Sequence, residues 1–562
     1  MRREVSVVNK KVCSFPILFA LLALLIGTCA VVFPASAQAA PTSTGSITVS
    51  GTVASSYDAY QIFSANVVDG DSDAKIATDL AWASDAVRDA VLPVLHSAGM
   101  PKSQTTAQEA AEWLNADSHL TSALSAQLAR SLQSSGAVSM ALNAGTAAEL
   151  PCGYWLIVAD DDAIAQGEVG TAPIMALVGG SAATVKPKAA TPKVAKHVLE
   201  DSTAAWQKAA DATVADDLYW RLSATVPAGL TAYDTYTVRF VDTMSAGLDP
   251  SKVAASMRVY VAAGADGGFD AVQTGKDGRA STDPAKGWTD ITAQCATKVA
   301  ADGTFTVRTG DLIAALGGAD AFTAGARVVA VYNAPLNSAC NHGIAKGNPN
   351  EVYLRYPRSP FADQSGDAGF TRTPSDDACA YTWDLALTKR GSDGDKPLAG
   401  AVLSITDDRG RTLAADGTWD VEGKATVTTG EDGRVTVSSV DSGKLEVREL
   451  KAPKGYTAFE GTRSVTVKAE GLDVDQVAAA MPKLTITAES PLRADSADGS
   501  TGSLEASLIN TPTGTPPSIT TGGFMPSTGD MAMYAAAAAA VAGAALIVVA
   551  LLVKRGGGSH KE

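Results

Sequence analysis

Three polar residues in the C-terminal part of this 562-residue chain occupy positions where strand alternation predicts a buried side chain. In the run from Trp383 to Lys389, alternate residues share one face, so Lys389 follows large apolar side chains on the same face. The same rule aligns Glu449 and Asn510 with the apolar residues that precede each of them. Because an unpaired buried charge costs several kcal/mol, we expect the three side chains to contact one another.

A buried lysine, a carboxyl group and an asparagine amide could react with one another. Burial disfavours the charged forms of the amine and the carboxyl group, and a neutral amine is a nucleophile. A protonated carboxyl group beside the amide can donate a hydrogen bond to it and polarise it. Attack of the amine of Lys389 on the amide carbon of Asn510 would expel ammonia and leave an isopeptide bond. The chain would be its own substrate and would react once.

The strands that would position these residues belong to a mainly β chain with three predicted domains. The first, residues 41–190, combines strand patterns with an Ala-rich helical stretch near 81–135, which we interpret as an insertion. A Lys/Pro/Ala-rich linker leads into the second domain, residues 191–380. The third, residues 381–513, has short strands separated by Gly/Asp-rich turns. This pattern is typical of tandem immunoglobulin-like β-sandwiches.

Residues 449–456 read Glu-Leu-Lys-Ala-Pro-Lys-Gly-Tyr and resemble the E-box (ExxAPxGY) of Cna B-type domains in Gram-positive pilins. The runs 398–401 and 510–512 fit the same pattern. The resemblance covers the third predicted domain and implies a Cna-type fold. It also implies that the lysine and the asparagine named above are the bonded pair, with Glu449 as the catalyst. An unreacted buried salt bridge is the alternative.

The second domain repeats the pattern. Lys196, Asp242 and Asn350 each share a strand face with apolar residues. The run 240–248 and the Gly-Asn-Pro-Asn sequence that ends at Asn350 look like those of the isopeptide-forming middle domain of fimbrial shaft proteins. This resemblance implies a bond between Lys196 and Asn350 with Asp242 as the acid. Asn348 has the same parity and is the rival acceptor, and a plain core with an exposed Lys196 is the other alternative.

Both ends of the chain carry signals for export and anchoring. Residues 1–39 combine a basic start, an apolar run and small residues, which predicts a secretory signal peptide; a retained membrane anchor is the alternative. A second apolar run, 531–553, is long enough to span a bilayer. The basic tail after it, 554–562, favours the cytoplasmic side, which would place nearly the whole chain outside.

A pentapeptide lies between a Pro/Gly/Thr-rich linker, 514–524, and the apolar run, and consists of Met525, Pro526, Ser527, Thr528 and Gly529. With the span and the tail it resembles the LPXTG sorting signal of Gram-positive surface proteins, with Met525 in place of Leu. The resemblance implies that a sortase cysteine attacks the carbonyl of Thr528, releases Gly529 onward and passes Thr528 to an amine. The transmembrane segment would then retain the chain only temporarily.

A lysine that could receive this threonine follows the first domain. Residues 184–188, Thr-Val-Lys-Pro-Lys, resemble the pilin motif, which ends in VYPK, with Lys186 in place of Tyr. The resemblance implies that Lys188 accepts Thr528 of the next subunit. Lys186 and Lys193 are alternative acceptors. The other interpretation is that Lys188 is a solvated linker lysine that accepts nothing.

Composition excludes some functions. With 45 Lys+Arg against 60 Asp+Glu, the chain carries a formal net charge of −15 and no basic stripe, which argues against nucleic-acid binding. After removal of the signal, Cys152, Cys295, Cys340 and Cys379 remain, and they allow three disulfide connectivities. The sequence has no CxxC and no Cys/His cluster of zinc spacing, so no metal or cofactor is predicted.

These resemblances identify the chain as similar to the major shaft subunit of a sortase-assembled pilus, secreted and anchored to the cell wall. They imply pilus-type and housekeeping sortases, other copies of the chain, minor pilins and peptidoglycan as partners. The alternatives are a non-polymerised wall-anchored adhesin or minor pilin, and a wall-anchored enzyme with its catalytic domain in residues 45–190. No catalytic constellation is recognisable there, so we predict no multiple-turnover enzyme.

Overall fold

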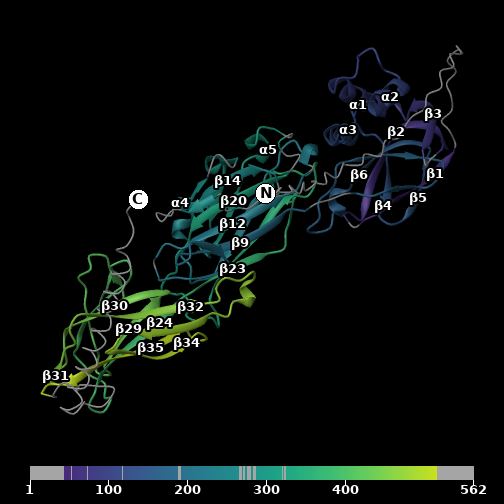
Figure 1. Ribbon diagram of the computed structural model, residues 1–562. Coiled ribbons are helices and arrows are strands. Elements are labelled where there is room, and N and C mark those ends of the chain that lie inside the picture. The colour runs from purple at the N-terminus through teal and green to yellow at the C-terminus, as the bar shows by residue number, and fades with distance from the viewer. Residues whose placement is uncertain are drawn as a thin grey trace, which may run out of the picture.

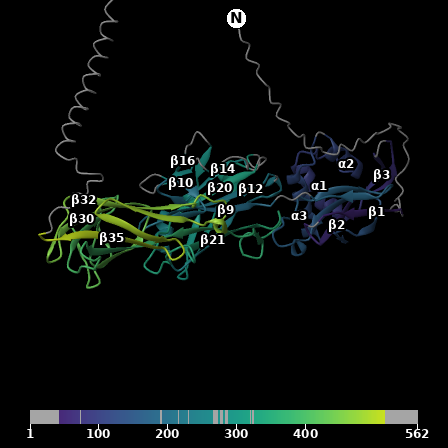
Figure 2. The same ribbon diagram turned by 60° about the horizontal axis from the view of Figure 1, so that its bottom comes forward.

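The computed structural model arranges the chain as three β-rich regions placed end to end (Figure 1), and a turned view shows the same order (Figure 2). It describes residues 43–514, apart from 52, 72–73, 117, 188–190, 215, 229, 265–268, 270–271, 275–279, 283–286, 319–320 and 322–324. The predicted signal peptide, sorting motif, membrane span and tail lie outside the described residues. Among the residues that are described, no helix is long and apolar enough to cross a bilayer.

The first region, residues 43–187, contains two sheets and a group of helices. One sheet has the order β5-β1-β8, with β1 (Thr44–Val49), β5 (Ala147–Pro151) and β8 (Ala183–Val185). The other has the order β3-β2-β6-β7 with β4 beside β2, and comprises β2 (Ser56–Asp69), β3 (Lys75–Trp82), β4 (Ser139–Asn143), β6 (Gly153–Ala159) and β7 (Ile174–Val178). An apolar cluster fills the space between the sheets.

The predicted helical stretch is present as an insertion between β3 and β4. It forms α1 (Asp85–Ser97), α2 (Ala107–Asn115) and α3 (Ser122–Ser135). Thr106 and Glu109 form a capping box that begins α2, and Gly136 ends α3 in the left-handed conformation, with φ of 73°. A second apolar cluster packs the helices against the sheet of β2 and β6. The chain is therefore mainly β with one helical part, as the sequence predicts.

The middle region, residues 191–381, is a sandwich of two sheets around one apolar core. The first sheet has the order β10-β9-β12-β20-β14-β17, with β9 (Lys193–Glu200), β10 (Ala205–Gln207), β12 (Tyr219–Val226), β14 (Arg258–Ala263), β17 (Trp288–Asp290) and β20 (Ala326–Asn333). The second has the order β11-β23-β21-β13-β19-β18 with β22 beside β21, and comprises β11 (Ala209–Asp211), β13 (Arg239–Met244), β18 (Ala296–Val299), β19 (Thr304–Arg308), β21 (Asn348–Pro357), β22 (Phe370–Arg372) and β23 (Asp376–Tyr381). Short elements in this region include α4 (Val253–Ser256), α5 (Leu312–Ala315) and the pair β15 (Val272–Thr274) and β16 (Ala280–Thr282).

The third region, residues 382–514, is a second sandwich with its own core. One sheet has the order β29-β24-β35-β31 with β34 beside β35, and comprises β24 (Trp383–Gly391), β29 (Arg434–Val440), β31 (Tyr456–Thr457), β34 (Leu492–Asp498) and β35 (Ser503–Pro512). The facing sheet has the order β27-β26-β25-β30-β32-β33 with β28 beside β25, and comprises β25 (Val402–Thr406), β26 (Thr412–Leu413), β27 (Trp419–Asp420), β28 (Val427–Thr428), β30 (Gly443–Lys451), β32 (Thr462–Glu470) and β33 (Lys483–Ala488).

Candidate functional site

The structure brings Lys389, Glu449 and Asn510 together in the core of the third region, where all three side chains are buried. Nδ2 of Asn510 donates hydrogen bonds to both carboxylate oxygens of Glu449, at 2.9 and 3.0 Å. Nζ of Lys389 lies 3.4 Å from Oε1 of Glu449 and donates to the carbonyl oxygen of Leu508 at 3.3 Å. The carboxylate therefore contacts both the amine and the amide.

Strand register explains why these side chains meet. Lys389 and Asn510 come from parallel neighbours, β24 and β35, in which Lys389 pairs with Leu508, two residues before Asn510. Glu449 comes from β30 in the facing sheet and reaches them across the core. The backbone N–H of Phe459 donates to Oε2 of Glu449 at 3.1 Å and so fixes the direction of the carboxylate.

The environment of this group favours reaction between the amine and the amide. Burial lowers the pKa of Lys389 to about 8, although the charge of Glu449 opposes the shift. A share of the amine is therefore neutral near neutral pH, and the neutral form is the nucleophile. Oδ1 of Asn510 is buried and accepts no hydrogen bond within the described part of the chain. Because an unsatisfied buried polar atom costs about 1–3 kcal/mol, the unreacted amide is incompletely stabilised here.

A similar group lies in the core of the middle region. Lys196 and Tyr332 come from β9 and β20 of one sheet, and Asp242 and Asn350 come from β13 and β21 of the other. Nζ of Lys196 pairs with Oδ2 of Asp242 and donates to the hydroxyl of Tyr332 at 2.9 Å. Nδ2 of Asn350 also donates to that hydroxyl, at 2.8 Å. All four side chains are buried.

Burial shifts the protonation of this second group in the same sense. It lowers the pKa of Lys196 to about 8, against the attraction of Asp242, and it raises the pKa of Asp242, against the charge of Lys196. Oδ1 of Asn350 accepts no hydrogen bond within the described residues, as with the asparagine of the third region. Burial therefore favours the neutral amine and the protonated acid beside an amide whose carbonyl oxygen accepts no hydrogen bond in the described residues.

Asn348 is also buried, but its amide forms hydrogen bonds with backbone groups. Its Oδ1 accepts from the backbone N–H of Asn341 at 2.8 Å, and its Nδ2 donates to the carbonyls of Asn341 and Ala380 at 2.9 and 3.2 Å. These bonds tie a loop to β23. The geometry thus favours Asn350 over Asn348 as the partner of Lys196.

Tyr332 is a residue that sequence reasoning missed. It ends the alternating run 328–332, in which Val328, Ala330 and Tyr332 share the inward face. A buried tyrosine hydroxyl usually needs a hydrogen-bond partner. The inward position of Tyr332 in the sequence pattern could therefore have indicated a polar group opposite it.

The first region offers no comparable group among its described residues, where the buried polar side chains are Ser64 and Ser125. The proposed acceptor Lys188 and the residues Met525, Pro526, Ser527, Thr528 and Gly529 lie outside the described residues. The two alternative acceptors, Lys186 and Lys193, are exposed on either side of Lys188.

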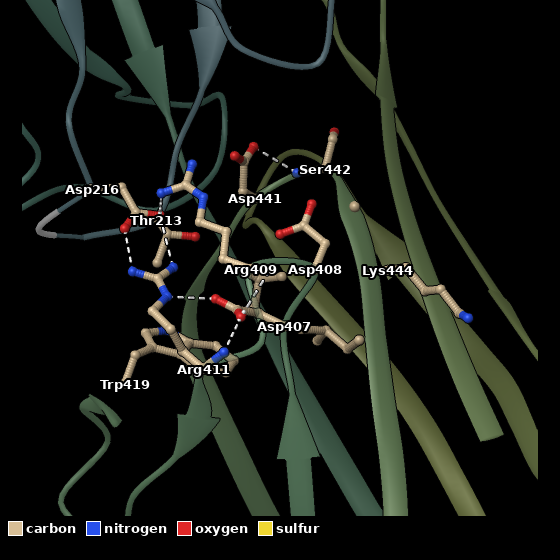
Figure 3. A pocket seen from close by; sticks show the side chains of 13 residues that line it. Thr213, Asp216, Asp407, Asp408, Arg409, Arg411, Trp419, Asp441, Ser442 and Lys444 are labelled. Atoms are coloured by element: carbon tan, nitrogen blue, oxygen red, sulfur yellow. Dashed lines mark hydrogen bonds and ion pairs between the residues drawn. The ribbon is translucent and has the colours of Figure 1, made fainter. Parts of the chain in front are cut away.

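The junction between the middle and third regions forms a polar contact that the sequence did not reveal (Figure 3). Arg411 donates to both carboxylate oxygens of Asp216 at 2.5 and 3.0 Å, and Arg409 pairs with the same aspartate at 2.8 Å. Nearby, Nε1 of Trp383 donates to Asp211 at 2.7 Å. The cavity at this place holds about 30 Å³, room for little more than a water molecule. We therefore interpret it as a packed interface.

The cysteines do not pair in the structure. Cys152, Cys295, Cys340 and Cys379 are all free thiols, so none of the three connectivities allowed by the sequence is present. Within the described part of the chain, no group of His, Cys, Asp and Glu side chains could hold a metal ion.

Comparison with known proteins identifies part of the chain. Residues 384–479 match the model of the SpaA family, described as a prealbumin-like fold domain. The third region is therefore similar to a SpaA domain. The matched residues include Lys389 and Glu449, and Asn510 follows them on β35.

A curated protein shows similarity over part of its length. A stretch of 143 residues is 31% identical to the trypsin-resistant surface T6 protein of Streptococcus pyogenes serotype M6. It covers 24% of this chain and 24% of that protein, so the chain matches about a quarter of the relative's length.

Solved structures of backbone pilins also align with the chain. The T6 backbone pilin of serotype M6 Streptococcus pyogenes is 17% identical, with 84% of this chain and 98% of that chain covered and a TM-score of 0.44. The major pilin SpaD of Corynebacterium diphtheriae is 16% identical, with the same coverage of both chains and a TM-score of 0.41. The resemblance to Gram-positive backbone pilins that the sequence motifs indicate is confirmed by the family and sequence matches.

Proposed function

We propose that this protein is the major subunit of a covalently polymerised cell-surface pilus that supports adhesion. In this proposal the exported chain has immunoglobulin-like domains at 41–190, 191–380 and 381–513. Sortase joins Thr528 of one subunit to Lys188 of the next. Internal Lys–Asn isopeptide bonds stiffen the second and third domains.

The observation that carries this proposal is the distribution of the two buried lysine–carboxyl–asparagine groups. In a polymer linked as proposed, a pulling force enters each subunit at Lys188 and leaves at Thr528. The first region precedes Lys188 and lies outside this path, whereas the middle and third regions lie on it. The two reactive groups occur in the two regions that would carry load, and the described residues of the first region have none.

The remaining parts of the proposal come from the sequence signals. The signal peptide 1–39 would export the chain, and the segment 531–553 would retain it in the membrane until sorting. Pilus-type sortase would add it to the fibre, and housekeeping sortase would attach the fibre to peptidoglycan. Minor pilins would join the same fibre. Each internal bond would form once by autocatalysis, so the protein would not be an enzyme with turnover.

Immunoblots of cell-wall extracts test polymerisation directly. Wild-type cells should show a ladder of high-mass bands, and Lys188→Ala should reduce it to a monomer. Lys186→Ala is the matched control, because it removes a lysine two residues away and should leave the ladder intact. A single band from wild-type cells would replace this proposal with a non-polymerised adhesin or minor pilin.

A further inference from the structure

The hydroxyl group of Tyr332 is the atom around which the buried polar side chains of the middle region are arranged. It accepts hydrogen bonds from Nζ of Lys196 at 2.9 Å and from Nδ2 of Asn350 at 2.8 Å. It donates to Oδ2 of Asp242 at 3.1 Å, the same oxygen that pairs with Lys196. A tyrosine hydroxyl has one proton and two lone pairs, so these contacts use all of its hydrogen-bonding capacity.

In the third region the acid is a glutamate, and its longer side chain contacts the asparagine amide directly. There, Nδ2 of Asn510 donates directly to both oxygens of Glu449. The acid of the middle region is an aspartate, which is shorter by one methylene group. The hydroxyl of Tyr332 lies between Asp242 and the amide of Asn350 and connects them.

We propose that Tyr332 is a catalytic residue of the reaction between Lys196 and Asn350, and that it relays a proton from Asp242 to the departing amide nitrogen. This inference rests on the internal bonds of the proposed function. It adds a second acid–base group in the middle region, where an aspartate replaces the glutamate of the third region.

The proposed step balances in atoms and charge. The lone pair of the neutral Lys196 amine attacks Cγ of Asn350, and an N–C bond forms as the carbonyl π electrons move onto Oδ1. Once Cγ is tetrahedral, Nδ2 has a lone pair that can accept a proton, and the hydroxyl of Tyr332 turns from Asp242 toward it. The carboxyl proton of Asp242 then passes to the oxygen of Tyr332 while the phenolic proton moves to Nδ2. The Cγ–Nδ2 bond breaks, the carbonyl re-forms and ammonia leaves. The surplus proton on Nζ returns to Asp242, so both acid–base groups end as they began.

Burial supports the protonation states that this step needs. It lowers the pKa of Lys196 to about 8, which makes the neutral amine accessible. It raises the pKa of Asp242, which favours retention of the acidic proton, and it raises the pKa of Tyr332, which keeps the phenol protonated.

Packing holds the ring of Tyr332 independently of its hydroxyl. The ring makes an edge contact with Phe305, with centroids 4.8 Å apart and planes at 75°. The strand that carries it, β20, pairs with β12 and β14 on its two sides. Tyr332→Phe therefore removes the relay and keeps the ring that fills the core.

The test follows bond formation in the newly synthesised full chain, sampled over time after a pulse of translation. Tryptic digestion and mass spectrometry quantify the branched peptide that joins residues 196 and 350. The branched peptide joining residues 389 and 510 in the same molecules is the internal reference. Tyr332→Phe should slow the first bond by about 100-fold, within the range typical of general acid–base catalysis, and leave the second unchanged.

Two further variants separate catalysis from structure. Tyr233→Phe removes another hydroxyl from the same core, one that makes no hydrogen bond in the described residues, and should leave both rates unchanged. The double variant Asp242→Glu with Tyr332→Phe replaces the relay by a longer acid, as in the third region. It should recover the first bond at least partly.

The possible outcomes distinguish failure of the Tyr332 relay from failure of the proposed internal bonds. Equal rates in wild type and Tyr332→Phe, with the bond present in both, would overturn the relay and leave the internal bonds standing. Loss of the bond in Tyr332→Phe without recovery in the double variant would assign the hydroxyl a structural role and also overturn it. Absence of the 196–350 branch from the wild-type chain would remove both proposals.

Discussion

Lys389 and Asn510 lie on two strands that form a parallel pair, the first strand of the third region and its last described strand. β24 and β35 run side by side in the same direction, with Lys389 opposite Leu508, two residues before Asn510. A bond between the two side chains would close a loop containing nearly all of the residues that match the SpaA family. In the chain-entropy model of a cross-link, closing a loop of about 100 residues stabilises a fold by about 4–5 kcal/mol.

Glu449→Ala should prevent this bond, because Glu449 contacts both reacting groups. The variant chain should retain the ammonia that the wild-type chain loses at this site, as intact mass measures. Its third region should lose about 4–5 kcal/mol of unfolding free energy from the missing cross-link. Glu446→Ala is the control, because Glu446 is an exposed carboxylate on the same strand. A branched 389–510 peptide in the Glu449→Ala chain would contradict the assigned role.

The two asparagines near the start of β21 should respond differently to substitution. Asn350→Ala should abolish the branched peptide at Lys196, because it removes the reacting amide. Asn348→Ala should keep the branch and lower the stability of the middle region by about 1–3 kcal/mol, since buried backbone groups lose their partners. Peptide mapping and thermal unfolding of both variants distinguish the roles. A branch at residue 348 in the wild-type chain would reverse them.

Alternation along single strands carried much of what the sequence could predict. Its period of two identifies which face a side chain occupies, and Lys389, Glu449 and Asn510 are indeed buried beside one another. The same rule has a limit at Asn348 and Asn350. They share a face and are both buried, so only the three-dimensional structure shows which amide shares a hydrogen-bond partner, the hydroxyl of Tyr332, with Lys196.

Contacts between elements distant in the chain could not be predicted in this way. Tyr332 meets Asp242 because two sheets face each other, and the sequence does not give the offset between sheets. Likewise, Asp211 meets Trp383 because the middle and third regions pack at a particular angle. Nothing in either local sequence marks the other as its partner.

Stability at that junction should depend on pH. Burial raises the pKa of Glu200 to about 7 and raises the pKa values of Asp211 and Asp441, with the carboxyl groups also repelling one another. Raised values mean that the folded chain binds more protons than the unfolded chain, so their stabilising contribution is complete below about pH 4 and is lost as pH rises toward 7. The melting temperature should therefore fall by several degrees between pH 5 and pH 7.5 in thermal scans.

Asp441→Asn provides the matched test of this pH dependence. It removes one charge and supplies an amide that can donate to Oδ1 of Asp211, which has no hydrogen-bond partner in the described residues. The variant should melt about 5 °C higher than wild type at pH 7.5 and show a smaller slope with pH. An unchanged slope would show that these carboxyl groups do not control the stability of the junction.

The internal bonds should limit how far a subunit extends under force. If a pull enters at residue 188 and leaves at residue 514, the load crosses from Lys196 to Asn350 and from Lys389 to Asn510. The segments 197–349 and 390–509 would then carry no tension.

In single-molecule pulling from residues 188 and 514, the wild-type chain should release neither segment. Lys389→Ala should add about 40 nm of contour length, from about 3.4 Å per extended residue, and Lys196→Ala about 50 nm. Because each variant removes one bond, the two increments should add in the double variant. Release of the full lengths from the wild-type chain would show that the load does not pass through these bonds.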